Sequence, residues 1–158
     1  MSQTVKSLTF DRAVLVASLA LAALLLGSPR AAAASSLYDE LGGEQGIARL
    51  SSACADQLAS AEATRDSFAG SNLKRVKHYL SLQLCDLAGG PCDYDGDSMQ
   101  VVHANLGITE AQFHIAVDML RALLRERGVS QGARNRLLKL LAPMKRDVVN
   151  VTVTGAAP

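Results

Sequence analysis

The sequence has no tryptophan, and its 158 residues include only three tyrosines and three phenylalanines. Proteins that bind single-stranded nucleic acid stack bases on aromatic side chains, so this scarcity argues against such a platform. An excess of one charge is also missing, because 16 lysines and arginines nearly balance 15 aspartates and glutamates. With a formal net charge of +1, no overall field draws the chain to nucleic acid or acidic surfaces.

Several motifs of common enzyme and metal sites are absent as well. The chain has no Gly-x-Ser-x-Gly elbow, no phosphate-binding loop, no His-Glu-x-x-His helix and no paired Cys-x-x-Cys of a zinc site. Asp93, Asp95 and Asp97 resemble the start of a calcium loop. However, Ser98 stands where that loop needs Gly, and Ala104 stands where it needs Glu. Ordinary hydrolase, nucleotide and calcium chemistry is therefore not indicated.

The N-terminus has the pattern of a secretory signal peptide. Lys6 and Arg12 precede an almost wholly apolar run, Ala13–Leu26, and small residues follow at Ala31–Ser36. We expect cleavage after Ala34 and export to the periplasm. An uncleaved membrane anchor is the alternative, but a spanning helix usually needs ~20 apolar residues.

The predicted organisation is a signal peptide at 1–34, one domain at 35–150, and a C-terminal tail at 151–158. The tail is either an ordered extension or a frayed end. With 49% hydrophobic residues overall, the domain can bury a core of its own.

Export changes how the three cysteines are interpreted, because an oxidising compartment permits disulfides. Cys85 and Cys92 flank a Gly-Gly-Pro turn that can bring them together. Their spacing allows either a disulfide or two separate thiols, since the Cα atoms must come within ~7 Å. Cys54 is then unpaired, and we interpret it as a small buried apolar residue rather than a ligand or redox centre.

Beyond Ser35, apolar residues recur every three or four positions, and no alternating pattern is long enough for a sheet. The domain is therefore predicted to be all-α. Helices are expected at 36–41, at 44–61, from a cap at Ser71 or Asn72 to Gly89, at 98–105, from Thr109 to Gly128, and at 134–142. Thr109 and Gln112 have the spacing of a capping box.

His103 is the sharpest chemical feature of the mature chain. It is expected on the apolar side of a short helix, beside Met99, Val102 and Leu106. Neutral imidazole in apolar surroundings is the form in which histidine binds haem iron. Spacing alone favours a hydrogen-bonded core or surface histidine over a ligand. His78 and His114 have polar neighbours and are expected to be exposed.

Lys74, Arg75 and Lys77 lie in the first turns of the third predicted helix. They form either a solvated face or an anchor for the propionates of a bound haem, where charge-assisted hydrogen bonds would orient the group.

Five short motifs, in order, resemble those of group I truncated haemoglobins. They are Leu37-Tyr38-Asp39-Glu40-Leu41-Gly42-Gly43, Phe68-Ala69-Gly70, Gly89-Gly90-Pro91, Tyr94-x-Gly96-x-x-Met99-x-x-x-His103, and Leu106-Gly107-Ile108-Thr109 with Phe113. The resemblance spans about Leu37 to Val149. Each motif alone is weak, but five with compatible spacings are specific.

The resemblance implies a shortened globin fold, two helices over two, with one haem b per chain ligated by His103. The iron would bind oxygen, nitric oxide or carbon monoxide. Tyr94 would pack beside the segment that carries His103. By position, the residues implied to line the pocket are Phe68, Leu73, Val76, Leu80, Val102, Leu106, Phe113 and Val117.

On the distal side the sequence departs from the family pattern. The second helix of these proteins usually carries a Phe-Tyr pair whose hydroxyl donates to the bound ligand, and the matching residues here are Cys54 and Ala55. Val76 and Leu80 match a frequent Gln or Leu pair on the third helix. Tyr79 and Gln83 are therefore the nearest polar candidates.

Losing one such hydrogen bond costs ~1.5–3 kcal/mol. Tight oxygen storage is therefore disfavoured relative to loose ligand binding, nitric oxide chemistry or redox work with a reductase. The sequence does not decide between storage and dioxygenase- or peroxidase-like catalysis. Two other classes stay open: a haemless helical interaction domain, and a six-coordinate electron-transfer or sensor protein that uses His78 or Tyr79.

Overall fold

Short polar residues begin five of the helices, and each accepts a hydrogen bond from an amide of the first turn. The computed structural model describes residues 35–151. The five helices that begin with a short polar residue are α2 (Leu37–Glu40), α4 (Leu73–Leu87), α5 (Met99–Val102), α6 (Glu110–Glu126) and α7 (Gln131–Leu141). Their respective caps are Ser36, Asn72, Ser98, Thr109 and Ser130. The capping box of Thr109 and Gln112 is present as predicted.

The longest helix of the described residues, α3 (Gly43–Ser60), begins after Gly42, whose φ of 88° is left-handed and suits glycine. Three short elements complete the fold: the 3₁₀ turns η1 (Arg65–Phe68) and η2 (Ala142–Met144), and the helix α8 (Lys145–Val148). The predicted signal peptide at 1–34 and residues 152–158 of the predicted tail lie outside the described residues.

The all-α prediction is confirmed. Residues 35–151 contain no β-strand, only an isolated parallel bridge between Thr109 and Val151. Two boundaries differ from expectation. α7 begins at Gln131 rather than near 134, because Ser130 caps it. The helix expected at 98–105 covers only Met99–Val102, and turns follow it, with Asn105 in the left-handed region at φ 62°.

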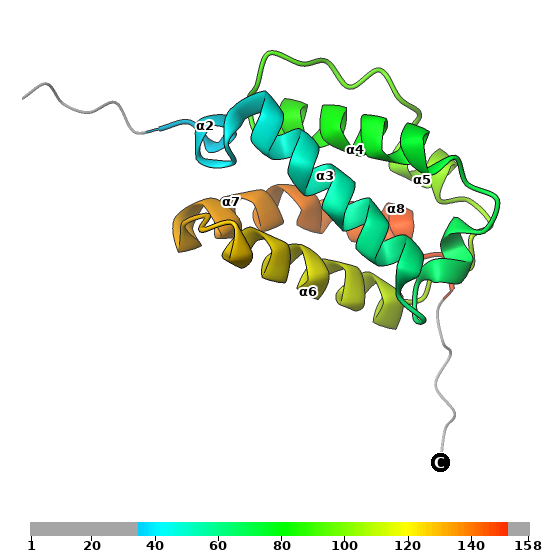
Figure 1. The fold of residues 1–158 in the computed structure, drawn as a ribbon. Helices are drawn as coiled ribbons and strands as arrows, with labels where there is room; N and C mark the ends of the chain where they lie inside the picture. Colours follow the sequence, from blue (N-terminus) through cyan, green and yellow to red (C-terminus); the bar gives the residue numbers. More distant parts are fainter. Residues whose placement is uncertain (1–34, 152–158) are drawn as a thin grey trace, which may run out of the picture. The chain divides into compact units, whose positions relative to one another are not determined.

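The helices form two packed pairs, α3 with α4 and α6 with α7 (Figure 1). α3 also packs on α6, and α2 contacts both α3 and α7. Between the pairs lies a core of side chains that are at most 1% exposed: Ile47, Leu50, Leu84, Leu124 and Leu137. Burying each such side chain stabilises the fold by about 1.5–3 kcal/mol. The core fixes the helices whose other faces build the site.

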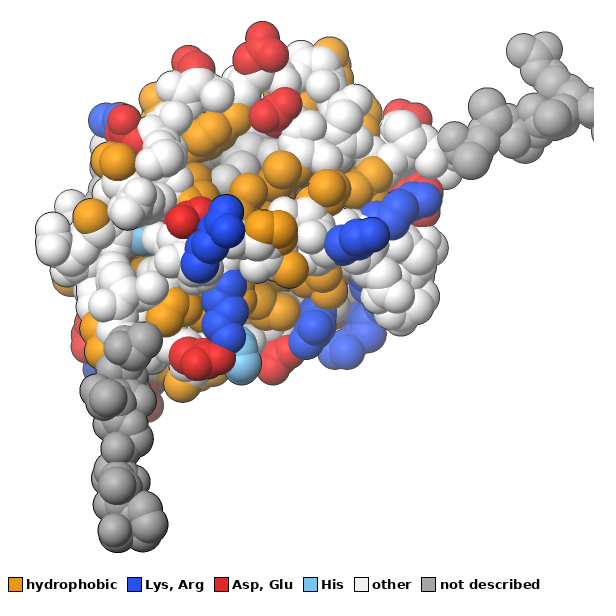
Figure 2. Space-filling view, turned by 180° about the vertical axis from the view of Figure 1, so that it is seen from behind, with side chains coloured by type: hydrophobic (Ala, Val, Ile, Leu, Met, Phe, Trp, Pro, Cys, Tyr) orange, Lys and Arg blue, Asp and Glu red, His pale blue; other side chains and the backbone are white. Residues whose placement is uncertain are grey.

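The surface carries charges of both signs. Figure 2 shows basic side chains beside acidic ones and hydrophobic patches, so no single sign covers that face. Some of these charges connect distant elements, since Arg136 pairs with Glu40, Lys145 with Glu110, and Lys77 with Asp56. Within residues 35–151, no helix combines the length and the hydropathy that a membrane span requires.

Candidate functional site

A mainly apolar cavity of about 400 Å³ lies where α3, α4, α5 and α6 meet. It contains His103 and most of the residues predicted for a pocket. The predicted residues in its lining are Phe68, Arg75, Val76, Tyr79, Leu80, Met99, Val102, His103, Leu106 and Phe113. Segments far apart in the sequence therefore converge on one imidazole.

Three of the predicted residues do not line the cavity: Leu73, Lys74 and Val117. On α4 the cavity is lined by Arg75, Val76, Tyr79, Leu80 and Gln83, which share one face of the helix, and Leu73 and Lys74 lie outside that face. On α6 the wall is formed by Gln112, Phe113 and Ala116, and Val117 lies one position further round the helix.

The lining also includes residues that the sequence did not suggest: Leu58, Thr64, Ile108, Ala116 and Val148. Ala116 follows Phe113 at helical spacing, so periodicity could have found it. Val148 had no such signal, because it lies near the end of the predicted domain, beyond the last predicted helix at 134–142.

His103 follows directly after α5, where it is half-buried and lines the cavity. Its Nδ1 lies 2.8 Å from the carbonyl oxygen of Met99. A carbonyl oxygen can only accept, so Nδ1 carries a proton, and in the neutral ring Nε2 then keeps its lone pair. This hydrogen bond fixes both the tautomer and the ring orientation, as second-shell partners of metal-binding histidines do.

Three polar side chains of the cavity wall already have partners within the protein. Gln83 donates through Nε2 to the sulfur of Met99 at 3.1 Å. Thr64 donates its hydroxyl to the carbonyl of Leu58 at 2.6 Å, and Gln112 donates to the carbonyl of Ala63 at 2.9 Å. These three side chains are therefore engaged within the protein rather than free to donate to a bound molecule.

Aromatic rings close one part of the cavity. Tyr79 and Tyr94 meet edge to face, with ring centroids 6.2 Å apart, and the Tyr94 hydroxyl donates to the carbonyl of Asp97 at 2.7 Å. Burial is the main reason that the pKa of Tyr94 is raised. A Cβ at Gly96 would lie 2.6 Å from the Tyr94 ring, so only glycine lets the rings pack here. Arg75 lies over the Tyr79 ring, 5.3 Å from its centroid.

Residues 36–150 match the model of the bacterial-like globins. The chain belongs to the bacterial-like globin family. The prediction from the five motifs is confirmed, and haem is the group that this globin binds.

Similar proteins indicate which type of globin this chain resembles. A group 1 truncated hemoglobin from Nostoc commune is 27% identical over 116 residues, which cover 73% of this chain and 98% of that protein. One from Mycolicibacterium paratuberculosis is 27% identical over 124 residues, covering 78% and 91%. These relatives are of the group I type that the motifs indicated.

Solved structures show the shared fold. The truncated hemoglobin of Tetrahymena pyriformis, in its Fe(III) form, superposes with a TM-score of 0.69 at 22% identity, covering 74% of this chain and all of that one. A 2/2 hemoglobin from Synechococcus gives 0.68 at 23% identity, again with 74% of this chain covered. The predicted two-over-two arrangement is confirmed.

The residues of the cavity fit haem. Its walls are mainly apolar, as the faces and edges of a porphyrin require, and the exposed Arg75 belongs to its lining. His103 would ligate the iron through Nε2, and Arg75 would pair with a propionate. Of the other predicted cations, Lys74 lines only an adjoining shallow depression that shares Arg75 and Tyr79 with the cavity, and Lys77 pairs with Asp56 at 2.7 Å.

On α3, Ala55 lines the globin's cavity where relatives were expected to place a tyrosine. Its neighbour Cys54 is buried and is a free thiol, as predicted, and it is not part of the lining. Burial raises the pKa of Cys54 to about 11, so the thiol is neutral near pH 7 and unreactive.

The other two histidines are exposed, as predicted. His114 lies 3.8 Å from Glu110. His78 lines the shallow depression rather than the cavity, which argues against it as a second haem ligand. Tyr79 does line the cavity, although its ring packs against Tyr94.

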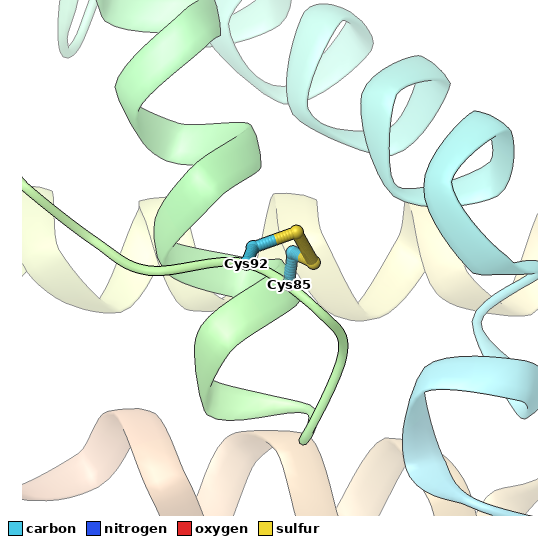
Figure 3. The surroundings of a disulfide bond; sticks show 2 residues. All are labelled: Cys85 and Cys92. Atoms are coloured by element: carbon cyan, nitrogen blue, oxygen red, sulfur yellow. A yellow bond between two sulfur atoms is a disulfide. The ribbon is translucent and has the colours of Figure 1, made fainter.

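The structure joins Cys85, at the end of α4, to Cys92 in the loop that leads to His103 (Figure 3). Their Cα atoms are 5.9 Å apart, within the range that a disulfide spans. A Cβ at Gly90 would lie 2.6 Å from the sulfur of Cys85, so the turn needs glycine for the bond to form. The disulfide therefore fixes the start of the loop that carries Tyr94.

Proposed function

We propose that the mature protein is an exported haem b globin that binds a diatomic ligand at an iron held by His103 and gives that ligand little hydrogen bonding. The observation that carries the proposal is the His103 imidazole, which lies in an apolar cavity with Nδ1 bonded to Met99 and Nε2 free to ligate. When bound, haem supplies an iron that takes oxygen, nitric oxide or carbon monoxide.

The residues of the chain then have separate tasks. His103 presents a neutral nitrogen of fixed orientation. The apolar walls, including Val76, Leu80 and Phe113, exclude water from the ligand side. Ala55 leaves room without supplying a donor. This arrangement favours fast exchange of the ligand over tight oxygen storage.

Loose binding suits nitric oxide chemistry or redox work better than storage. Repeated redox turnover requires an electron donor, and a reductase is the class of partner that would supply it. Measured turnover of nitric oxide with and without a reducing system would test this part of the proposal.

A haem titration of the purified mature protein tests the function. We expect one equivalent of haem to give a Soret band that shifts when the reduced protein meets carbon monoxide. Absence of a Soret band after reconstitution would contradict the proposal and leave the alternative of a haemless helical interaction domain. A low-spin ferrous spectrum without added ligand would instead indicate a six-coordinate iron.

Export is supported by the basic, apolar and small-residue segments of 1–34 and by a disulfide that suits an oxidising compartment. The intact mass of protein recovered from a periplasmic fraction tests it. We expect a chain beginning at Ser35. A full-length chain in the membrane fraction would favour the uncleaved anchor.

A further inference from the structure

Asn150, near the C-terminal end of the described chain, reaches back to the segment that follows His103. Its Nδ2 donates to the carbonyl oxygen of His103 at 2.6 Å. Its Oδ1 accepts from the backbone N–H of Ile108 at 2.7 Å. One side chain therefore spans both ends of the segment 103–108.

The backbone beside Asn150 holds the same segment. The N–H groups of Asn150 and Val151 both donate to the carbonyl of Ile108, at 3.0 and 3.1 Å. Val151 also forms the isolated bridge with Thr109, the cap of α6. Asn150 and Val151 thus both contact this part of the site.

The segment needs such support because it is not a regular helix. α5 ends at Val102, and both Asn105 and Gly107 adopt left-handed φ values, 62° and 65°. Apart from Asn150, the carbonyl of His103 accepts only a long bond from the N–H of Leu106, at 3.3 Å, among the described residues. The shorter bond from Asn150 is the stronger restraint on the His103 backbone.

We propose that Asn150 is a positioning residue for the imidazole of His103, an inference that rests on the proposed ligation of iron by His103. The ring is held by Met99 through Nδ1, and the backbone of the same residue is held by Asn150. The two restraints together set the direction of Nε2. Val148, two residues before Asn150, lines the cavity, so the same segment also closes it.

If Asn150 only stabilised the fold, its removal would lower the unfolding temperature without changing the iron–histidine bond. Asn150 is exposed, so water can replace its hydrogen bonds when the side chain is removed, and global stability should change little. Water cannot, however, hold the imidazole of His103 in its position as Asn150 does. The signature of positioning is therefore a changed iron–histidine bond with a nearly unchanged unfolding temperature.

The experiment compares wild type with Asn150→Ala and Asn150→Asp. The aspartate keeps an acceptor for the N–H of Ile108 and removes the donor to His103. Asn135→Ala is the matched control, because Asn135 accepts a side-chain hydrogen bond from Gln131 on the exposed face of α7. The readouts are the iron–histidine stretching band of the reduced protein by resonance Raman, haem loss to an excess of acceptor protein, and the unfolding temperature.

We expect both Asn150 variants to shift or broaden the iron–histidine band and to lose haem about tenfold faster, as outer-shell changes at metal ligands do. Asn135→Ala should match wild type. An unchanged band and rate of haem loss in both Asn150 variants would overturn the inference while leaving the proposed function intact. Absence of the band in wild type would instead reject the proposed function, and the inference with it.

Discussion

The side-chain nitrogen of Gln83 donates to the sulfur of Met99 across 3.1 Å. The same nitrogen lies 3.7 Å from the sulfur of Met144, so both N–H groups of the amide have sulfur partners. Gln83 was one of the two polar side chains that could have replaced the missing distal tyrosine. Tyr79, the other, packs against Tyr94 at one part of the cavity. Gln83 is therefore not placed as a free donor, and the ring of Tyr79 is held against Tyr94.

Restoring a hydroxyl at position 55 should therefore strengthen oxygen binding. Ala55 is 1% exposed and lines the cavity, so the side chain of Ala55→Tyr would enter it. A new hydrogen bond to the ligand is worth ~1.5–3 kcal/mol, so we expect oxygen to dissociate roughly tenfold to a hundredfold more slowly. Stopped-flow displacement of oxygen by carbon monoxide measures this rate.

Ala55→Phe is the matched control, because it adds nearly the same volume without the hydroxyl. If the Tyr and Phe variants release oxygen at the same rate, steric effects dominate and the account of the distal side is incorrect. A wild-type rate already as slow as that of tyrosine-containing relatives would contradict it as well.

The Cys85–Cys92 disulfide should stabilise the fold. It closes a short loop, with a sequence separation of 7, and restricting the unfolded chain over such a loop is worth about 2–3 kcal/mol. Urea unfolding with and without a thiol reductant measures the difference. We expect the reductant to lower the stability of wild type and to leave a Cys85→Ala, Cys92→Ala double variant unaffected.

Thiol counts check that the bond is the cause. Denatured protein should show one thiol, that of Cys54, before reduction and three afterwards. Wild type that counts three thiols after reduction but keeps its urea midpoint would show that the disulfide contributes no stability.

Acid should weaken the contact between α2 and α7. Glu40 accepts hydrogen bonds from Arg136 and from Ser130, and the Arg136 bond is the first cause of its lowered pKa. A carboxyl with a lower pKa in the folded state contributes stability that is present above its ordinary value of 4.5 and lost as the pH falls through the folded value. The contribution is small, because the pair is at the surface.

Unfolding temperatures measured between about pH 5 and about pH 3 test this, since that range spans the titration of the carboxyl. We expect Glu40→Gln to flatten the decline relative to wild type. Glu126→Gln, which removes an exposed carboxylate from the end of α6, should keep the wild-type slope. Parallel curves for wild type and Glu40→Gln would mean that the contact with Arg136 does not titrate in this range.

Local rules predicted much of this structure. Helical periodicity gave the all-α class, and the spacing of Thr109 and Gln112 gave a real capping box. His103 could be selected because it is an imidazole among apolar residues. These features depend on neighbours within about one helical turn, which a sequence pattern records directly.

Other parts of the site depend on contacts between distant residues. Asn150 reaches His103 across 47 positions, and nothing around it in the sequence marks that partner. Arg75 lines the cavity while Lys74 does not, and this difference follows from the rotation of α4 set by core packing. Tertiary packing decides which of two adjacent basic residues faces the cavity, and the sequence alone does not distinguish them.

The central claim, that His103 ligates the haem iron, is tested most directly by the visible spectrum of His103→Gly beside wild type. Spectra of the oxidised, reduced and carbon monoxide forms would be recorded with and without added imidazole. The account predicts that the variant loses or alters the wild-type Soret band and that free imidazole, which can occupy the vacated space, restores it. A variant that keeps the wild-type spectra and haem affinity without imidazole would contradict the claim.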